Sequence, residues 1–173
     1  MQKPTVTMHA LTTEKLASVN AVNSQITDPQ EHLYWCSDSV PFGKQLHAFA
    51  SGDEPVVCWT ASNHEDAVVG HLELHHNEFG WVIARVWVHA AWRRTGVARA
   101  LYLCALALVF RHADTAACFC YSNNHPSKNL QKSLGFEEVP DWEHQTIDLL
   151  KLGRACFERL SMDSAQLHTE PSL

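Results

Sequence analysis

The chain has 173 residues, 46% of them hydrophobic and 18% charged, and it carries a formal net charge of −6. These values exclude wholesale disorder and fit one domain with a buried core. The acidic balance and the lack of a basic stripe argue against nucleic-acid binding, and they suit a cationic substrate or simply an acidic soluble surface. The longest apolar run, 100–110, is too short for a membrane span of about 20 residues.

Apolar periodicity, β-branched residues and turn residues predict alternating strands and helices along the chain. The expected strands are 5–10, 56–62, 68–76, 81–88, 115–121, 136–139 and 145–152. The expected helices are 12–26, 30–36, 96–112 and 126–134, with a further helical piece at 44–50. Gly135 follows the last helix as its C′ residue. This order predicts a mixed α/β fold on one central sheet, in a single domain over 1–162 with a polar tail over 163–173.

Cysteine and histidine are spaced unlike metal ligands. None of the six cysteines forms a C-x-x-C pair, and no signal-peptide pattern precedes the first strand, so we expect free thiols in a reducing, cytoplasmic compartment. His71 and His75 share one face of a strand, while His76 points to the other face. Because no carboxylate or thiol completes a convincing ligand set there, we expect no metal site.

The segment 86–98 reads as a strand, a loop and the start of a helix. A helix start presents unpaired N–H groups and a partial positive charge, which suit an anion such as a diphosphate. Gly96 lets a ligand approach the backbone closely, and Ala98 keeps the next turn narrow. Arg93 and Arg94 add positive potential. The alternative interpretation is a solvated corner, because glycine is common near helix starts.

Two patterns in this part of the chain resemble the signatures of the GNAT acetyltransferase superfamily. The first, similar to V-x-P-x-Y/F-R/Q-x-x-G-x-G/A, is Val88-x-Ala90-x-Trp92-Arg93-x-x-Gly96-x-Ala98. The second, similar to V-x-x-x-N-x-x-A-x-x-L-Y-x-x-L-G-F, runs from Cys120 through Asn124, Ser127 and Leu130 to Leu134-Gly135-Phe136. Val69-Gly70 also resembles the family's third strand. The resemblance covers 69–136, and the N-terminal part matches only in its order of elements.

The resemblance implies a fold and a cofactor. The family's central mixed sheet has about 6–7 strands, is splayed between the fourth and fifth strands, and is flanked by about 4 helices. Acetyl-CoA would lie in the splay, with a backbone N–H of the signature strand polarising the thioester carbonyl. The residues expected to contact it are Val86, Trp87, Val88, Arg93, Arg94, Thr95, Gly96, Val97, Ala98, Arg99, Asn124 and Ser127.

Gln131 is the most serious departure from the family pattern, whose tyrosine at this position is the usual general acid. A glutamine amide donates a hydrogen bond but delivers no proton. Tyr121 is the candidate substitute, and its alternative interpretation is a packed strand aromatic. The other departures, Ala90 for proline and Ala98 for glycine, are tolerated substitutions.

An ammonium acceptor must lose a proton before it can attack. Glu73, His71 and His75 alternate onto one face of the strand before the signature strand, and Glu73 is the candidate base, directly or through water. A histidine of the same face is the alternative base, and a solvated polar face is the other interpretation. Arg85 would orient an acidic substrate group or pair with Glu73.

The expected function is transfer of an acetyl group to a primary amine by direct attack in a ternary complex, with no metal. The acceptor is a small-molecule or peptide amine, and a homodimer is left open. Aromatic residues early in the chain would form the acceptor pocket or belong to the core: Tyr34, Trp35, Phe42 and Trp59. The alternatives are a catalytically silent acyl-CoA-binding module and an unrelated α/β protein that binds another phosphate.

Overall fold

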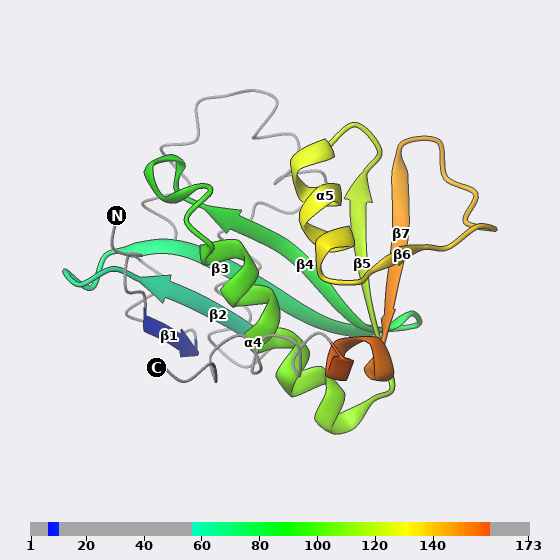
Figure 1. Ribbon diagram of the computed structural model, residues 1–173, viewed down its shortest axis with the longest axis horizontal. Coiled ribbons are helices and arrows are strands. Elements are labelled where there is room, and N and C mark those ends of the chain that lie inside the picture. The colour runs from blue at the N-terminus through cyan, green and yellow to red at the C-terminus, as the bar shows by residue number, and fades with distance from the viewer. Residues whose placement is uncertain (1–6, 11–56, 160–173) are drawn as a thin grey trace, which may run out of the picture. The chain divides into compact units, whose positions relative to one another are not determined.

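The computed structural model describes residues 7–10 and 57–159 (Figure 1). The helices expected at 12–26, 30–36 and 44–50 and the tail expected at 163–173 lie outside these residues, as do Tyr34, Trp35 and Phe42. The predictions made for these segments therefore stay predictions.

The described residues form one sheet and a few helices. The strands are β1 (Thr7–Ala10), β2 (Val57–Ser62), β3 (Val68–Asn77), β4 (Gly80–Val88), β5 (Thr115–Tyr121), β6 (Glu137–Glu138) and β7 (Ile147–Gly153). The helices are the 3-10 helix η1 (Ala90–Trp92), α4 (Val97–His112), α5 (His125–Ser133) and a helical segment at 154–159. The strand order is β1-β2-β3-β4-β5-β7-β6. The predicted mixed fold of strands and helices on one sheet is confirmed, whereas the splay between the fourth and fifth strands stays a prediction.

β6 is shorter than the strand expected at 136–139, and the contacts at its two ends explain why. The amide of Phe136 donates to the carbonyl of Gln131 at 3.1 Å, so it belongs to the end of α5. Gly135 precedes it with φ +84°, as expected of a C′ residue that closes a helix. After Val139, Pro140 has no N–H to continue the ladder.

The chain divides into two compact units, Met1–His76 with Ile83–Ala105, and Asn77–Val82 with Leu106–Leu173. In the first unit, β1, β2 and β3 pair as antiparallel neighbours. The turn between β2 and β3 is closed by the Asn63 side chain, whose Oδ1 accepts from the amides of Glu65 and Ala67, each at 3.0 Å. The register pairs Trp59 with Leu72 and Thr60 with His71.

Gly70 marks a close approach between β3 and the first turns of α4. A Cβ at this position would lie 3.0 Å from Val97 Cγ1, 3.1 Å from the Trp87 carbonyl oxygen and 3.3 Å from Leu101 Cδ1. The α4 side of β3 is therefore the side of Gly70. Because side chains alternate along a strand, Leu72 and Leu74 belong to that side, and the intervening residues belong to the opposite one.

β4 is distorted at Arg85, whose φ is +43°. A side chain rarely adopts the left-handed region inside a strand, and holding it there costs on the order of 1–2 kcal/mol. Distortions of this kind re-aim side chains and are common beside functional sites.

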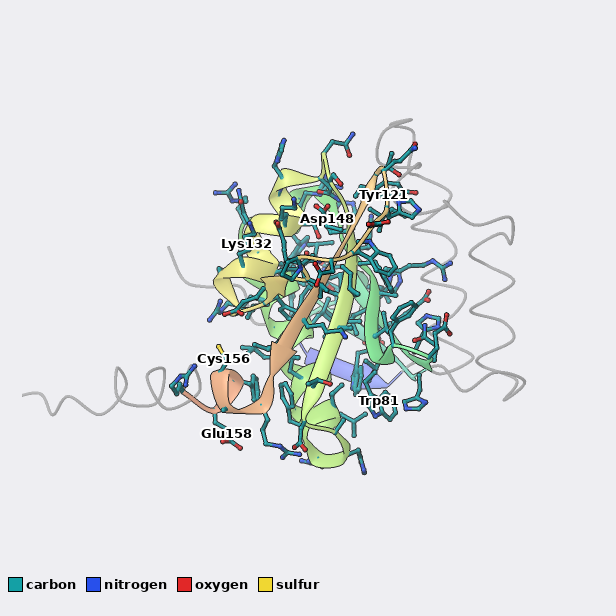
Figure 2. All side chains as sticks on the ribbon, turned by 90° about the vertical axis from the view of Figure 1, so that its right-hand side faces the viewer. Trp81, Tyr121, Lys132, Asp148, Cys156 and Glu158 are labelled. Carbon is teal, nitrogen blue, oxygen red and sulfur yellow. The ribbon has the colours of Figure 1, made fainter. Side chains whose placement is uncertain are left out.

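The second unit is built on β5, β7 and β6, which pair antiparallel. Val82, Ala117 and Leu149 form its buried cluster, against which aromatic residues pack: Phe79, Phe119 and Trp142. Figure 2 shows Tyr121 and Asp148 at one end of β5 and β7, with Cys156 and Glu158 beyond the other end. The helical segment at 154–159 is held there by Phe157, whose ring lies 5.0 Å from that of Phe110.

Candidate functional site

The loop between β4 and α4 is fixed by its own hydrogen bonds. The ring of His89 caps η1, because its Nδ1 accepts from the amide of Ala91 at 3.2 Å. The amide of Trp92 donates to the His89 carbonyl at 2.8 Å, and the Thr95 hydroxyl donates to the Trp92 carbonyl at 2.6 Å. These local contacts give the loop one conformation in front of the helix.

The backbone adopts a left-handed conformation at two positions just before α4. Arg94 has φ +65° and Gly96 has φ +96°. Such alternation turns successive N–H groups toward one side and makes concavities that bind anions. A Cβ placed on Gly96 would meet nothing within 4 Å, so the space beside this residue is open.

The N-terminus of α4 presents amide groups without helical partners. Its helical hydrogen bonds begin with the amide of Ala100, which donates to the Gly96 carbonyl at 3.0 Å. The amides of Val97, Ala98 and Arg99 precede this bond, and no carbonyl lies one turn earlier for them within the helix. The first turn contains no acidic residue. The helix dipole therefore favours an anion at this end.

The two arginines of the signature are placed differently. The Nε of Arg93 donates to the Val88 carbonyl at 3.1 Å, so this side chain closes the loop onto β4. Arg94 is exposed and has the left-handed backbone described above. Val86 and Val88 are half-buried and Trp87 is buried, after the distortion at Arg85. Their predicted contacts with acetyl-CoA stay predictions.

A cluster of polar side chains is buried on the face of β3 opposite to Gly70. The Oε2 of Glu73 accepts from His75 Nε2 at 2.8 Å and from Arg85 Nη1 at 2.9 Å. Its Oε1 lies 4.0 Å from His71 Nε2. The shared face predicted for these three β3 residues is confirmed, and of the two roles considered for Arg85 the structure shows the pair with Glu73. We call His71, Glu73, His75 and Arg85 the Glu73 cluster.

The Glu73 cluster shifts the protonation of its buried members. Burial lowers the pKa of His71 from 6.5 to about 4, against the opposing charge of Glu73. For Glu73, burial alone would raise the pKa, but the hydrogen bond from His75 and the charge of Arg85 outweigh it and lower the pKa. At neutral pH the cluster therefore contains a neutral His71 beside an ionised Glu73.

In the second unit, Asn124 and Ser127 form the start of α5. The Oδ1 of Asn124 accepts from the Ser127 amide at 3.3 Å, which makes Asn124 the N-cap. Gln131, which replaces the family's tyrosine, is buried and donates from Nε2 to the Ser127 hydroxyl at 3.3 Å. The expected roles of Asn124 and Ser127 toward acetyl-CoA stay predictions.

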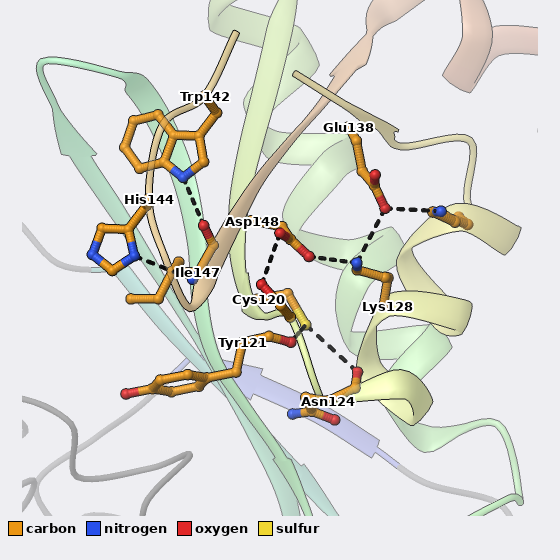
Figure 3. Close-up of polar contacts among 11 residues, drawn as sticks. Cys120, Tyr121, Asn124, Lys128, Glu138, Trp142, His144, Ile147 and Asp148 are labelled. Carbon is orange, nitrogen blue, oxygen red and sulfur yellow. Dashed lines mark hydrogen bonds and ion pairs between the residues drawn. The ribbon is translucent and has the colours of Figure 1, made fainter. Parts of the chain in front are cut away.

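An ionic network that the sequence analysis missed anchors α5 (Figure 3). Lys128 pairs with Asp148 of β7 and, at 3.2 Å, with Glu138 of β6. Lys132 reaches Glu138 at 2.9 Å, and the Ser122 hydroxyl donates to Asp148 at 2.9 Å. The hydrogen bond from Lys128 lowers the pKa of Asp148. The available signal was the spacing of the two lysines, four residues apart on one helix face.

Tyr121 ends β5, where it pairs with Ile147 and is half-buried. Its ring points away from Asp148 and Lys128 (Figure 3). The thiol of the preceding Cys120 lies 3.7 Å from the Asn124 carbonyl, and burial raises its pKa. The cysteines that the structure describes with their side chains are free: Cys104, Cys118, Cys120 and Cys156.

Within 7–10 and 57–159, no group of three or more histidine, cysteine or acidic residues is arranged to hold a metal ion. In the same part of the chain, no helix is both long and apolar enough to cross a membrane.

A family model described as the acetyltransferase (GNAT) family matches residues 23–136. The match includes both signatures and extends upstream of the resemblance found in the sequence. The chain therefore belongs to the GNAT acetyltransferase family. A search of curated proteins found no match.

Solved structures share the fold at low sequence identity. A probable acetyltransferase from Staphylococcus epidermidis is 16% identical with a TM-score of 0.70, over 87% of this chain and 99% of that one. Arabidopsis thaliana NAA60 in complex with acetyl-CoA is 13% identical with a TM-score of 0.69, over 87% and 99%. The spermidine N-acetyltransferase of Vibrio cholerae in complex with CoA and spermine is 14% identical with a TM-score of 0.68, over 88% and 98%.

Proposed function

We propose that this chain transfers an acetyl group from acetyl-CoA to a primary amine by direct attack in a ternary complex. Membership of the GNAT family supports acetyl transfer, and the α4 N-terminus supports CoA as the carrier. The observation that carries the proposal is the left-handed backbone at Gly96, which opens the space beside the first amides of α4. A diphosphate brings the negative charge that this end of a helix stabilises.

The contacts to acetyl-CoA follow from this placement. The amides from Arg94 to Arg99 would hold the diphosphate, with the exposed Arg94 side chain adding positive charge. A backbone N–H near Val86 or Val88 would polarise the thioester carbonyl and stabilise the oxyanion of the tetrahedral intermediate. The full proposed set is Val86, Trp87, Val88, Arg93, Arg94, Thr95, Gly96, Val97, Ala98, Arg99, Asn124 and Ser127.

The proposed proton transfers use the Glu73 cluster and Tyr121. The Glu73 cluster would take a proton from the attacking ammonium. Tyr121 is the proposed acid toward the departing thiolate, because the Gln131 amide delivers no proton and already donates to Ser127. A thiolate is also a competent leaving group by itself, since free thiols titrate near about 8.5.

The acceptor is proposed as a small-molecule or peptide amine. Among the solved structures that share the fold, one enzyme is a spermidine N-acetyltransferase and another is the ribosomal-protein-S18-alanine N-acetyltransferase of Escherichia coli. A net charge of −6 suits approach of a cation. The free cysteines suit a reducing compartment such as the cytoplasm.

The test of the CoA site is the substitution Gly96→Glu. It places bulk and negative charge beside the α4 amides, and we expect acetyl-CoA affinity to fall by about a hundredfold or more. The measurement is a calorimetric titration with acetyl-CoA.

The matched control is Gly80→Glu. Gly80 has φ +83° and an equally open Cβ position, so it imposes similar backbone strain at the turn between β3 and β4. Wild-type affinity in Gly80→Glu together with lost binding in Gly96→Glu supports the site. Wild-type affinity in both variants would remove the assignment.

Gln131 favours a second candidate function, a silent acyl-CoA-binding module. The two functions differ in turnover, since both bind acetyl-CoA but only the enzyme releases free CoA with an amine present. We expect release with at least one amine of a panel that contains spermidine and a peptide with N-terminal alanine. Binding of acetyl-CoA without release to any amine of the panel would favour the silent module.

A further inference from the structure

The Glu73 cluster contains a buried carboxylate, that of Glu73, and a partly exposed ring, that of His75. The Glu73 side chain is 2% exposed and that of Arg85 is 14% exposed. The His75 side chain is 29% exposed. Within the cluster, His75 is therefore the side chain most exposed to solvent, whereas the Glu73 carboxylate is buried.

The hydrogen bonds fix which nitrogen of His75 is basic. Because Glu73 is ionised, both of its oxygens only accept hydrogen bonds, so the proton between the pair belongs to His75 Nε2. In the neutral ring, Nδ1 then holds the lone pair. A carboxylate that orients the ring and stabilises its cation is the arrangement by which histidine works as a base.

Glu73 is poorly placed to exchange protons itself. Its Oε2 accepts from both Arg85 and His75, so protonation would weaken two charge-assisted bonds at once. Arg85 reaches this oxygen from the left-handed distortion in β4, and the ion pair helps to offset the cost of that backbone. These contacts suit a fixed anion better than a group that cycles between charged and neutral forms.

We infer that His75 is the proton acceptor of the reaction, and that Glu73, itself held by Arg85, is the residue that positions it. The inference rests on the proposed function. His75 contacts the Glu73 carboxylate, and the other charged and titratable groups of the described residues around that carboxylate are His71 from β3 and Arg85 from β4. His76 belongs to the other face of the strand.

The acceptor ammonium gives one proton to His75 Nδ1 and becomes an amine with a free lone pair. The nitrogen attacks the thioester carbon, so a C–N bond forms, the C–S bond breaks, and the sulfur leaves as a thiolate. The thiolate takes a proton from Tyr121, which in turn takes the second proton of the nitrogen, and the His75 cation returns its proton to water. Glu73 stays ionised throughout.

The test compares His75→Ala with His76→Ala in the full chain, with spermidine and the alanine peptide as acceptors. We expect kcat to fall by on the order of a hundredfold in His75→Ala, with the KM for acetyl-CoA unchanged. Added imidazole should restore part of that activity, which it would not do for a structural defect. The kcat of His76→Ala should stay within about twofold of the wild-type value, because His76 is exposed and most surface substitutions have small effects.

The pH profile separates the two residues of the pair. If His75 is the base, the acidic limb of the kcat profile persists in Glu73→Gln and is lost in His75→Ala. Loss of that limb in Glu73→Gln, with a normal limb in His75→Ala, would overturn the inference and make Glu73 the base. Transfer at the wild-type rate by His75→Ala would also overturn it. Absence of transfer by the wild type to either acceptor would contradict the proposed function as well.

Discussion

Individual residues of β3 show how one strand serves two purposes. Toward α4 it presents Gly70 and leucines that pack closely, and on the other face it buries the Glu73 cluster. The sequence alternation predicted both faces. It did not predict that Glu73 would be buried, because a strand of alternating polar residues usually faces water. The fold buries the Glu73 side chain. The cost of burying its charge is offset by Arg85, which lies twelve residues later on β4.

His71 makes folding stability depend on pH. Its folded pKa of about 4 lies below the unfolded value of 6.5, so the unfolded chain binds more protons between these values. The free energy of unfolding should therefore fall as pH drops from about 6.5 to about 4, by about 3 kcal/mol in total. Urea unfolding across this range checks the prediction.

The control for this prediction is His71→Gln, which removes the titrating ring. Its unfolding free energy should vary less between pH 6.5 and 4 than that of the wild type. As pH falls below about 4.5, the ordinary pKa of a glutamate, Glu73 adds a loss of the same sign, because its folded pKa is lowered from that value. An unchanged slope in His71→Gln would contradict the account of this residue.

Gly70 tests the packing of β3 on α4. Gly70→Ala would bring a methyl group to 3.0 Å from Val97 Cγ1 and 3.1 Å from the backbone oxygen of Trp87. We expect a loss of about 1–3 kcal/mol in the free energy of unfolding, since the backbone oxygen cannot easily move aside. Gly153→Ala is the control, because a Cβ there meets nothing within 4 Å. Equal stability of the two variants would show that β3 and α4 are not in close contact.

At the scale of elements, α5 shows what anchors a helix that is too polar to be held by its core face. Of its nine residues only Gln131 is buried. The helix is capped by Asn124 and closed by Gly135, and of these two ends the sequence predicted the one at Gly135. Its attachment to β7 through Lys128 and Asp148 was not, because those residues are far apart in the chain.

Lys128→Ala tests this anchor. The substitution leaves the carboxylates of Asp148 and Glu138 without a shared cation, and we expect a loss of about 1 kcal/mol in the free energy of unfolding, smaller at high salt. Lys151→Ala is the control, because Lys151 is an exposed lysine on β7. The midpoint of urea unfolding at two salt concentrations measures the difference. Equal midpoints for the two variants would mean that the network contributes nothing.

The strand and helix boundaries were predictable where local chemistry sets them. The helix expected at 96–112 and the strand expected at 115–121 match α4 and β5 closely, because the turn residues around them are strong signals. The distortion at Arg85 was not predictable, since arginine has no preference for a left-handed backbone. A left-handed backbone at residue 96 agrees with the sequence, because glycine is the residue that most readily adopts this conformation.

At the scale of the whole molecule, the family is established and the chemistry is assigned to two places on the chain. The α4 N-terminus is proposed to hold the diphosphate, and the Glu73 cluster is proposed to handle the proton of the acceptor. The first assignment is the central one, because without a bound thioester there is no acyl group to transfer.

The most direct measurement compares the affinities of acetyl-CoA and S-acetylpantetheine, which lacks the diphosphate and the nucleotide. If the amides around Gly96 hold the diphosphate, the wild type should bind acetyl-CoA at least about a hundredfold more tightly, a difference of about 2.7 kcal/mol. In Gly96→Glu that advantage should largely disappear, while the affinity for S-acetylpantetheine stays near its wild-type value. An advantage that survives the substitution intact would contradict the account.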